Sequence, residues 1–300
     1  MSHDHGAANR TRLLVALAIT ATIFVVELVG AAIAGSLALL ADAGHLLSDL
    51  VGLGIALVAT AVAARPATDR QTFGFQRAEV FGALANGLIL AGVAIAIAIE
   101  SVRRLLEAQP AAVGGLPVLL VAAVGLVASV VSLLVLRGGA HGSINVRGAY
   151  LEVLGDLFGS VAALIAGAVI LTTGFGRADA IASLVIAAFI APRGIVLLRD
   201  VFRVLSESVP RGTSVTEIRD HILATQGVAG VHDVHVWSIT TGAPVFSAHV
   251  VVANEVFESA RTARLLDALQ SCLADHFDVA HSTFQLEPEE HAAGEHPHHD

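Results

Sequence analysis

The chain has 300 residues, of which 55% are hydrophobic and 14% are charged, and its mean hydropathy is +0.75. Soluble domains carry more charge, so this composition indicates an integral membrane protein with room for about six spans and one small domain. The net charge of -9 argues against nucleic acid as a partner. The single cysteine, Cys272, excludes a disulfide framework and a cluster of thiolates, so we expect any metal chemistry to use histidine and carboxylate.

The N-terminal part of the chain is a polar tail followed by a predicted span. The tail, residues 1–11, contains His3 and His5, and the span, residues 13–34, carries one acid, Glu27. Acids at membrane depth are costly and mark functional sites by default. A protonated Glu27 that bonds to a neighbouring helix is the alternative interpretation.

The second predicted span, residues 37–63, contains three titratable side chains. His45 and Asp49 are four residues apart and therefore share one face of a helix, with Asp42 one turn earlier on the same side. An imidazole beside a carboxylate supplies half of a tetrahedral site for a divalent metal ion. The alternative is a core histidine whose hydrogen bond to Asp49 is purely structural.

A matching pair lies in the fifth predicted span, residues 149–173, where Glu152 and Asp156 have the same spacing. The stretch EVLGDLFG reads against HLLSDLVG of the second span with Leu, Asp, Leu and Gly in register. Such weak internal repeats are typical of transporters, around a site near the membrane midplane. Two helices that offer two ligands each can close a four-coordinate site, whereas a carboxylate at a helix start plus an unrelated buried aspartate is the alternative.

The other predicted spans cover residues 79–102, 118–136 and 180–198, and the arginines beside the span ends indicate the orientation of all six. With both termini inside, the arginines on the cytoplasmic side are Arg10, Arg12, Arg65, Arg70, Arg77, Arg137, Arg147, Arg199 and Arg203, against Arg103, Arg104 and Arg177 outside. The positive-inside rule therefore predicts cytoplasmic N and C termini. The predicted six-helix domain extends over residues 12–207.

From residue 208 onward the composition is that of a soluble domain, which we expect to end at residue 288. The patterns predict a helix over 213–225, a hairpin of strands over 231–240 and 245–253, a helix over 257–277 and a third strand over 279–286. The order αββαβ predicts a small α+β sandwich. The acidic, histidine-rich tail, residues 289–300, is predicted to be disordered.

This C-terminal domain also carries candidate metal ligands. His232, His235 and His249 lie on the hairpin strands, and His281 and Glu287 lie on or beside the third strand. They are consistent with a second metal cluster, at the domain edge or at a dimer interface. Histidines that are simply exposed on strand surfaces are the alternative.

Four stretches of the sequence together form a specific pattern: SLALLADAGHLLSD, FGFQRAEVFGALANG, NVRGAYLEVLGD and GVHDVHVWSITTGAPVFSAHVVV. In these stretches the sequence resembles the cation diffusion facilitator family of divalent-metal/proton antiporters, and within it the bacterial zinc and cadmium exporters. The resemblance implies a homodimer of six-helix protomers in the inner membrane, each with a ferredoxin-like cytoplasmic domain. It also implies proton-coupled efflux of zinc, with cadmium and cobalt as further substrates, and neither enzymatic activity nor a catalytic cofactor.

The resemblance further implies a set of site residues. The transport site would comprise His45, Asp49, Glu152 and Asp156. The cytoplasmic ligands would be His232, His249 and Glu287, with His235 and His281 as further candidates.

One position departs from the family pattern, because zinc members usually carry histidine where this chain has Glu152. One imidazole with three carboxylates favours harder ions such as Mn²⁺, so a manganese or iron exporter of the same fold is the alternative function. A membrane-anchored metal sensor is a further alternative. A sensor would not need ligand pairs in two spans, and this argues against it.

Overall fold

The computed structural model describes residues 3–108, 112–138, 144–258, 261–277, 279 and 281–292. The chain divides into two compact units, one formed by Met1–Leu57 with Ala83–Leu198 and the other by Val58–Gly82 with Arg199–Asp300. The ends of three long helices therefore belong to the second unit. The two units are described separately below.

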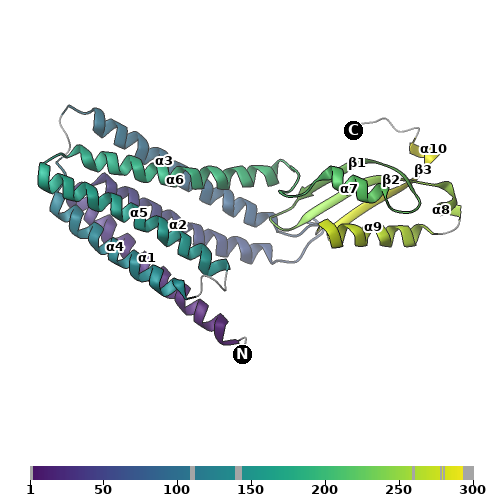
Figure 1. The fold of residues 1–300 in the computed structure, drawn as a ribbon, viewed down its shortest axis with the longest axis horizontal. Coiled ribbons are helices and arrows are strands. Elements are labelled where there is room, and N and C mark those ends of the chain that lie inside the picture. Colours follow the sequence, from purple (N-terminus) through teal and green to yellow (C-terminus); the bar gives the residue numbers. More distant parts are fainter. Residues whose placement is uncertain are drawn as a thin grey trace. The chain divides into compact units, whose positions relative to one another are not determined.

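Six long apolar helices confirm the predicted spans (Figure 1). They are α1 (His3–Ala34), α2 (Leu37–Ala63), α3 (Arg77–Leu106), α4 (Gly115–Arg137), α5 (Ile144–Thr173) and α6 (Arg177–Leu205). Each is long enough to cross a bilayer, which needs about 20 residues. Several helices extend beyond the apolar stretch that the sequence identified, and α1 begins inside the predicted polar tail.

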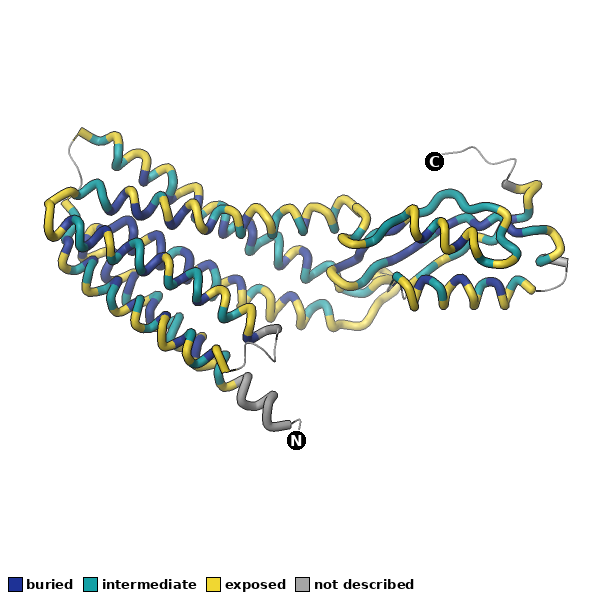
Figure 2. Tube along the Cα trace, viewed as in Figure 1, coloured by how far each residue is buried: buried dark blue, intermediate teal, exposed yellow. Residues whose placement is uncertain are grey.

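Small residues let the helices of the first unit approach closely. Its core is built largely from alanines such as Ala38, Ala41 and Ala163, each with no exposed surface. A Cβ atom at Gly167 of α5 would lie 2.8 Å from the backbone nitrogen of Leu119 in α4, so only glycine allows this contact. Large apolar side chains such as Ile33, Leu57 and Ile99 are exposed. Figure 2 shows such exposed residues alternating with buried ones along the long helices. Small residues between the helices and large apolar residues on their outer faces are expected for a helix bundle in lipid.

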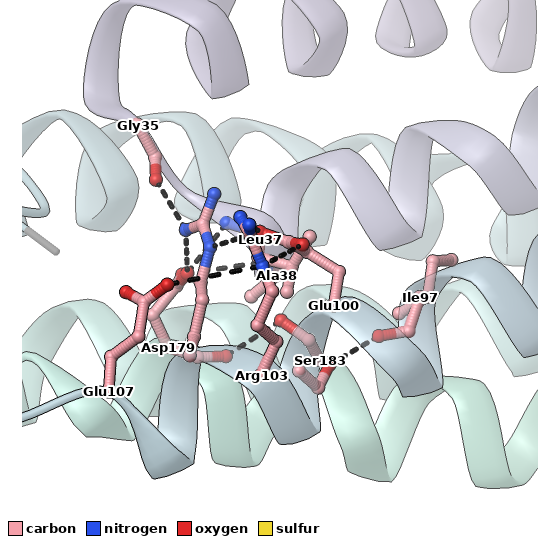
Figure 3. A network of polar contacts seen from close by, with 11 residues as sticks. Gly35, Leu37, Ala38, Ile97, Glu100, Arg103, Glu107, Asp179 and Ser183 are labelled. Carbon is pink, nitrogen blue, oxygen red and sulfur yellow. Dashed lines mark hydrogen bonds and ion pairs between the residues drawn. The ribbon is translucent and has the colours of Figure 1, made fainter. Parts of the chain in front are cut away.

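A polar network fixes the start of α2 against α6 and α3 (Figure 3). Asp179 of α6 is 1% exposed and accepts hydrogen bonds from the Leu37 and Ala38 amides, at 2.6 and 3.3 Å, and from the Ser36 hydroxyl. Arg104 of α3 lies 3.7 Å from the same carboxylate and donates to the Gly35 carbonyl oxygen at 3.0 Å. The Asp179 carboxylate thus caps a helix N-terminus from another helix and sets the position of α2.

The C-terminal part of the second unit contains a three-stranded sheet with helices on one face (Figure 1). Its elements are α7 (Val215–Leu223), β1 (Val228–Ser238), β2 (Pro244–Val252), α8 (Asn254–Glu258), α9 (Thr262–Phe277), β3 (His281–Pro288) and α10 (Glu289–Ala292). The strand order is β1-β2-β3, with β1 and β2 antiparallel and β2 and β3 parallel. The predicted αββαβ order is confirmed, with α8 and α10 as additions.

The core of this sheet domain lies between the sheet and the helices. Alternate residues of β2, among them Phe246, Ala248 and Val250, face Ile218 of α7 and Leu269 of α9. The intervening residues of β2, including His249, therefore face away from the helices. The α10 helix occupies the start of the segment predicted to be disordered, and residues 293–300 lie outside the described residues.

Candidate functional site

The first candidate site lies in the six-helix unit and begins with the predicted pair on α2. His45 is 5% exposed, and its Nε2 atom lies 3.7 Å from Asp49 Oδ2 across one helical turn. Asp156 of α5 is 7% exposed and brings its Oδ1 atom within 3.6 Å of the same imidazole nitrogen. The ligand atoms of His45, Asp49 and Asp156 all lie within 4.8 Å of one another.

These distances suit a tetrahedral metal ion. Metal–ligand bonds of 2.0–2.2 Å place neighbouring ligand atoms roughly 3.3–3.6 Å apart, close to the observed 3.6 and 3.7 Å. The Asp156 Oδ1 atom is buried and has no hydrogen-bond partner among the described residues. Buried carboxylate oxygens normally accept hydrogen bonds. The Asp156 Oδ1 atom is therefore suited to coordinate a cation.

Glu152, the fourth predicted ligand, lies one turn before Asp156 on α5 but stands outside this set of three. The residue is exposed, whereas His45 and Asp156 are buried. Its role as a ligand stays a prediction.

Arg193 of α6 is a site residue that the sequence analysis missed. Its Nη1 atom lies 3.1 Å from His45 Nε2. Because a guanidinium group can only donate, the imidazole nitrogen that faces the two carboxylates accepts this bond. An ionisable residue inside a predicted span was the signal that could have found it.

Two glycines of α5 make room for this arrangement. A Cβ atom at Gly155 would lie 2.6 Å from Arg193 Nη2, and one at Gly159 would overlap the Asp42 carboxylate. His45, Asp42, both glycines and Arg193 line one cavity between α2, α5 and α6. Glycines one helical turn apart on α5 therefore make room for the charged groups of the neighbouring helices.

Two further acids extend from the site into the bundle. Asp42 is 2% exposed and accepts a hydrogen bond from the Ser160 hydroxyl at 3.4 Å, and Glu27 of α1 is 1% exposed. Both line a small cavity together with Asp156. A group of buried carboxyls thus reaches from the ligand set to α1.

The second candidate site lies on the sheet face that points away from the helices. Glu287 of β3 is 1% exposed, and its two oxygens lie 3.3 Å from His232 Nε2 and 2.7 Å from His249 Nδ1. The register of the sheet explains this contact, because His232 pairs directly with His249 and Glu287 with the nearby Val251. Gln285 donates to the Glu287 carboxylate at 2.7 Å and holds it in place.

This group also has the chemistry of a metal site. Two imidazoles and one carboxylate are a common donor set for Zn²⁺, with one position left for water or another ligand. The His232 Nε2 and Glu287 Oε2 atoms are buried and have no hydrogen-bond partner among the described residues.

His235 and His281 lie on the same sheet face but outside this set of three. His281 packs edge-on against Phe73, with ring centroids 5.5 Å apart. His235 is exposed and pairs with Ser247, and a register shift separates it from His232. Their role as ligands stays a prediction.

A bundle of six spans with a buried histidine–aspartate cluster, followed by a small α+β domain with a cluster of its own, defines a multi-pass membrane protein with two candidate metal centres. The cation efflux transmembrane domain family matches residues 13–206, and the family of cation efflux protein cytoplasmic domains matches residues 210–289. The chain therefore belongs to the cation efflux family, also called the cation diffusion facilitator family, as its sequence motifs predicted.

Similar proteins cover nearly the whole chain. The metal cation efflux system protein CzcD of Cupriavidus metallidurans is 42% identical over 287 residues, which are 95% of this chain and 89% of that protein. A cadmium, cobalt and zinc/H(+)-K(+) antiporter of Bacillus subtilis is 34% identical, covering 97% of this chain and 93% of its own. The zinc transporter ZitB of Escherichia coli is 37% identical, covering 95% and 92%.

Proposed function

We propose that this protein exports divalent metal cations, with zinc, cadmium and cobalt as substrates, in exchange for protons. The observation that carries the proposal is the cluster of buried His45 and Asp156 with half-buried Asp49 between two membrane helices. Charged groups at membrane depth are costly and mark ion pathways. The names of the relatives support the same ions: cadmium, cobalt and zinc for the Bacillus subtilis antiporter and zinc for ZitB.

The mechanism that fits this cluster is alternating access of a single site. The metal ion would bind between α2 and α5, with Asp49 and Asp156 supplying negative charge and His45 supplying a neutral nitrogen donor. Arg193 would leave the His45 nitrogen as the ion arrives, because its hydrogen bond occupies the lone pair that the metal needs. In the metal-free site, Arg193 would balance the charge of the carboxylates. In the metal-bound site, it would move away from His45.

Proton exchange follows from the same groups. Metal binding needs a neutral imidazole and ionised carboxylates, so protons and metal compete for one set of atoms. Neighbouring carboxylates disfavour joint ionisation, which keeps protons available for exchange. The buried acids Asp42 and Glu27 lie next to this set and are suited to hold further protons.

The proposal includes a regulatory role for the second cluster. Metal at His232, His249 and Glu287 would bring together the cytoplasmic domains of a homodimer and favour the metal-loaded state of the membrane part. The family match over residues 210–289 supports the assignment of this domain to the cytoplasm. The arginine distribution supports cytoplasmic termini. Insertion in the inner membrane is part of the proposal through the resemblance to bacterial members of the family.

Metal flux into proteoliposomes, measured for Zn²⁺, Cd²⁺, Co²⁺, Mn²⁺ and Fe²⁺ with and without a pH gradient, tests the proposal. We expect zinc, cadmium and cobalt to move and to follow the gradient. Flux of none of these ions would refute transport and favour the alternative of a membrane-anchored metal sensor.

The manganese or iron alternative depends on Glu152 and has its own test. If this carboxylate sets the preference, wild type moves Mn²⁺ or Fe²⁺ best and Glu152→His shifts the preference to Zn²⁺, because imidazole suits zinc better than manganese. If zinc moves best in both proteins, Glu152 is a tolerated replacement and the zinc assignment stands.

A further inference from the structure

A third group of metal-binding side chains lies on the helical side of the sheet domain. His221 comes from α7, and Cys272 and His276 come from successive turns of α9. The ligand atoms of the three side chains all lie within 4.8 Å of one another. Because α7 and α9 cover the sheet face opposite His249, this group is separated from the His232 cluster by the sheet and the core.

The geometry of the group resembles part of a tetrahedral zinc site. The Cys272 Sγ atom lies 3.7 Å from His221 Nδ1, and the rings of His221 and His276 are 5.1 Å apart. Zinc bonds of 2.3 Å to sulfur and 2.0–2.1 Å to nitrogen separate the two ligand atoms by about 3.6 Å. An ion can therefore fit with little movement of the side chains.

Packing alone does not require these three groups to converge. The two helices are already joined by an apolar core that includes Ile222 and Leu273, which are fully buried. Phe277 meets the His221 ring edge-on, with ring centroids 5.2 Å apart, and the His221 Nδ1 atom faces the Cys272 thiol. Both histidines are exposed, so an ion can enter from solvent.

The Cys272 thiol is the one sulfur donor of the group. Burial, and then the nearby Asp275 carboxylate, raise the pKa of Cys272. A metal ion that binds here must displace the thiol proton, and the resulting thiolate is a strong ligand for soft ions.

We propose that His221, Cys272 and His276 form a binding site for a soft or borderline divalent cation such as Cd²⁺ or Zn²⁺, with water as the fourth ligand. The site joins α7 to α9. Its donors differ from those of the His232 cluster, where a carboxylate takes the place of the thiolate. The inference does not depend on the transport function, because all three residues lie outside the membrane spans.

A spectroscopic titration tests the site directly. Cys272 is the only cysteine in the chain, so any sulfur-to-metal charge-transfer band reports on this position alone. The full-length protein, purified in detergent with any affinity tag removed, is titrated with Cd²⁺. We expect an ultraviolet sulfur-to-metal charge-transfer band that saturates at one Cys272-bound ion per chain. The histidines of the tails cannot produce this band, because they contain no sulfur.

Variants show whether the histidines take part. We expect His221→Gln and His276→Gln each to weaken the Cd²⁺ affinity read from this band by at least about tenfold, since even the loss of an outer-shell partner costs 10- to 100-fold. Cys272→Ser should abolish the band. The matched control, His232→Gln with His249→Gln, removes imidazoles from the other cluster and should leave the titration unchanged.

A second test uses the wild-type protein alone and therefore does not depend on whether the variants fold. Cd²⁺ should slow alkylation of Cys272 by N-ethylmaleimide at least about tenfold if the thiolate is coordinated. Absence of both the band and the protection at saturating Cd²⁺ would overturn the proposal. An identical titration of the band in His221→Gln, His276→Gln and wild type would also overturn the proposal. That result would mean that Cys272 binds Cd²⁺ without the two histidines.

Discussion

At the scale of single residues, the membrane cluster contains a cation as well as the predicted acids. Arg193 lies 3.1 Å from the nitrogen of His45 that faces Asp49 and Asp156. In the proposed mechanism, a bound metal ion and the guanidinium group would therefore compete for the same lone pair and repel each other. On this proposal, Arg193 would contribute to the free-energy cost of binding a metal ion at the site.

This competition predicts the effect of Arg193→Gln. The substitution removes the positive charge and weakens the hydrogen bond to His45, so the Zn²⁺ concentration that gives half-maximal flux should fall about tenfold, equivalent to about 1.4 kcal/mol. Flux into proteoliposomes at graded Zn²⁺ concentrations measures it. Arg199→Gln, at an exposed position on the same helix, is the control. An unchanged or higher half-saturating concentration in Arg193→Gln would contradict the competition.

At the scale of elements, the site depends on how α2 is anchored. Asp179 accepts hydrogen bonds from two amides at the start of α2 and from Ser36, and it lies beside Arg104. A buried charged acceptor with several donors stabilises strongly, because its loss leaves those donors and the partner charge unsatisfied.

Asp179→Ala should therefore destabilise the membrane unit by about 3 kcal/mol. Thermal unfolding of the protein in detergent, compared with wild type, measures the loss. Glu107→Gln affects only an exposed ion pair, to Arg103 at 3.9 Å, and should change stability by less than about 0.5 kcal/mol. Equal unfolding temperatures for Asp179→Ala and Glu107→Gln would show that the network does not anchor α2.

The elements themselves were largely predictable from the sequence, and the site only in part. Hydropathy identified all six spans, and strand alternation identified the sheet, because burial imposes these periods on the sequence. The i, i+4 spacing identified His45 with Asp49. The contact of Arg193 with His45 depends on how α6 packs against α2, and the approach of His221 to Cys272 depends on how α7 packs against α9. Sequence periodicity contains no information on either packing arrangement.

At the scale of the whole molecule, we expect the second cluster to couple metal concentration to flux. The combined substitution His232→Ala with His249→Ala should remove the activation of flux by metal on the cytoplasmic side, while leaving basal flux. Flux at fixed substrate, measured with graded cytoplasmic metal, reveals the activation. Ser247→Ala with Thr283→Ala, on the same sheet face but not among the predicted ligands, is the control. Wild-type-like activation in the first double variant would rule out this coupling.

The central claim is that His45, Asp49 and Asp156 form the site through which metal crosses the membrane. Zn²⁺ uptake and counter-flow of protons, recorded together in proteoliposomes, test it most directly. We predict that Asp49→Ala abolishes uptake, that His45→Ala weakens the coupling of uptake to protons, and that Asp69→Ala, in an exposed loop, changes neither. Full, proton-coupled Zn²⁺ uptake by Asp49→Ala would contradict the claim.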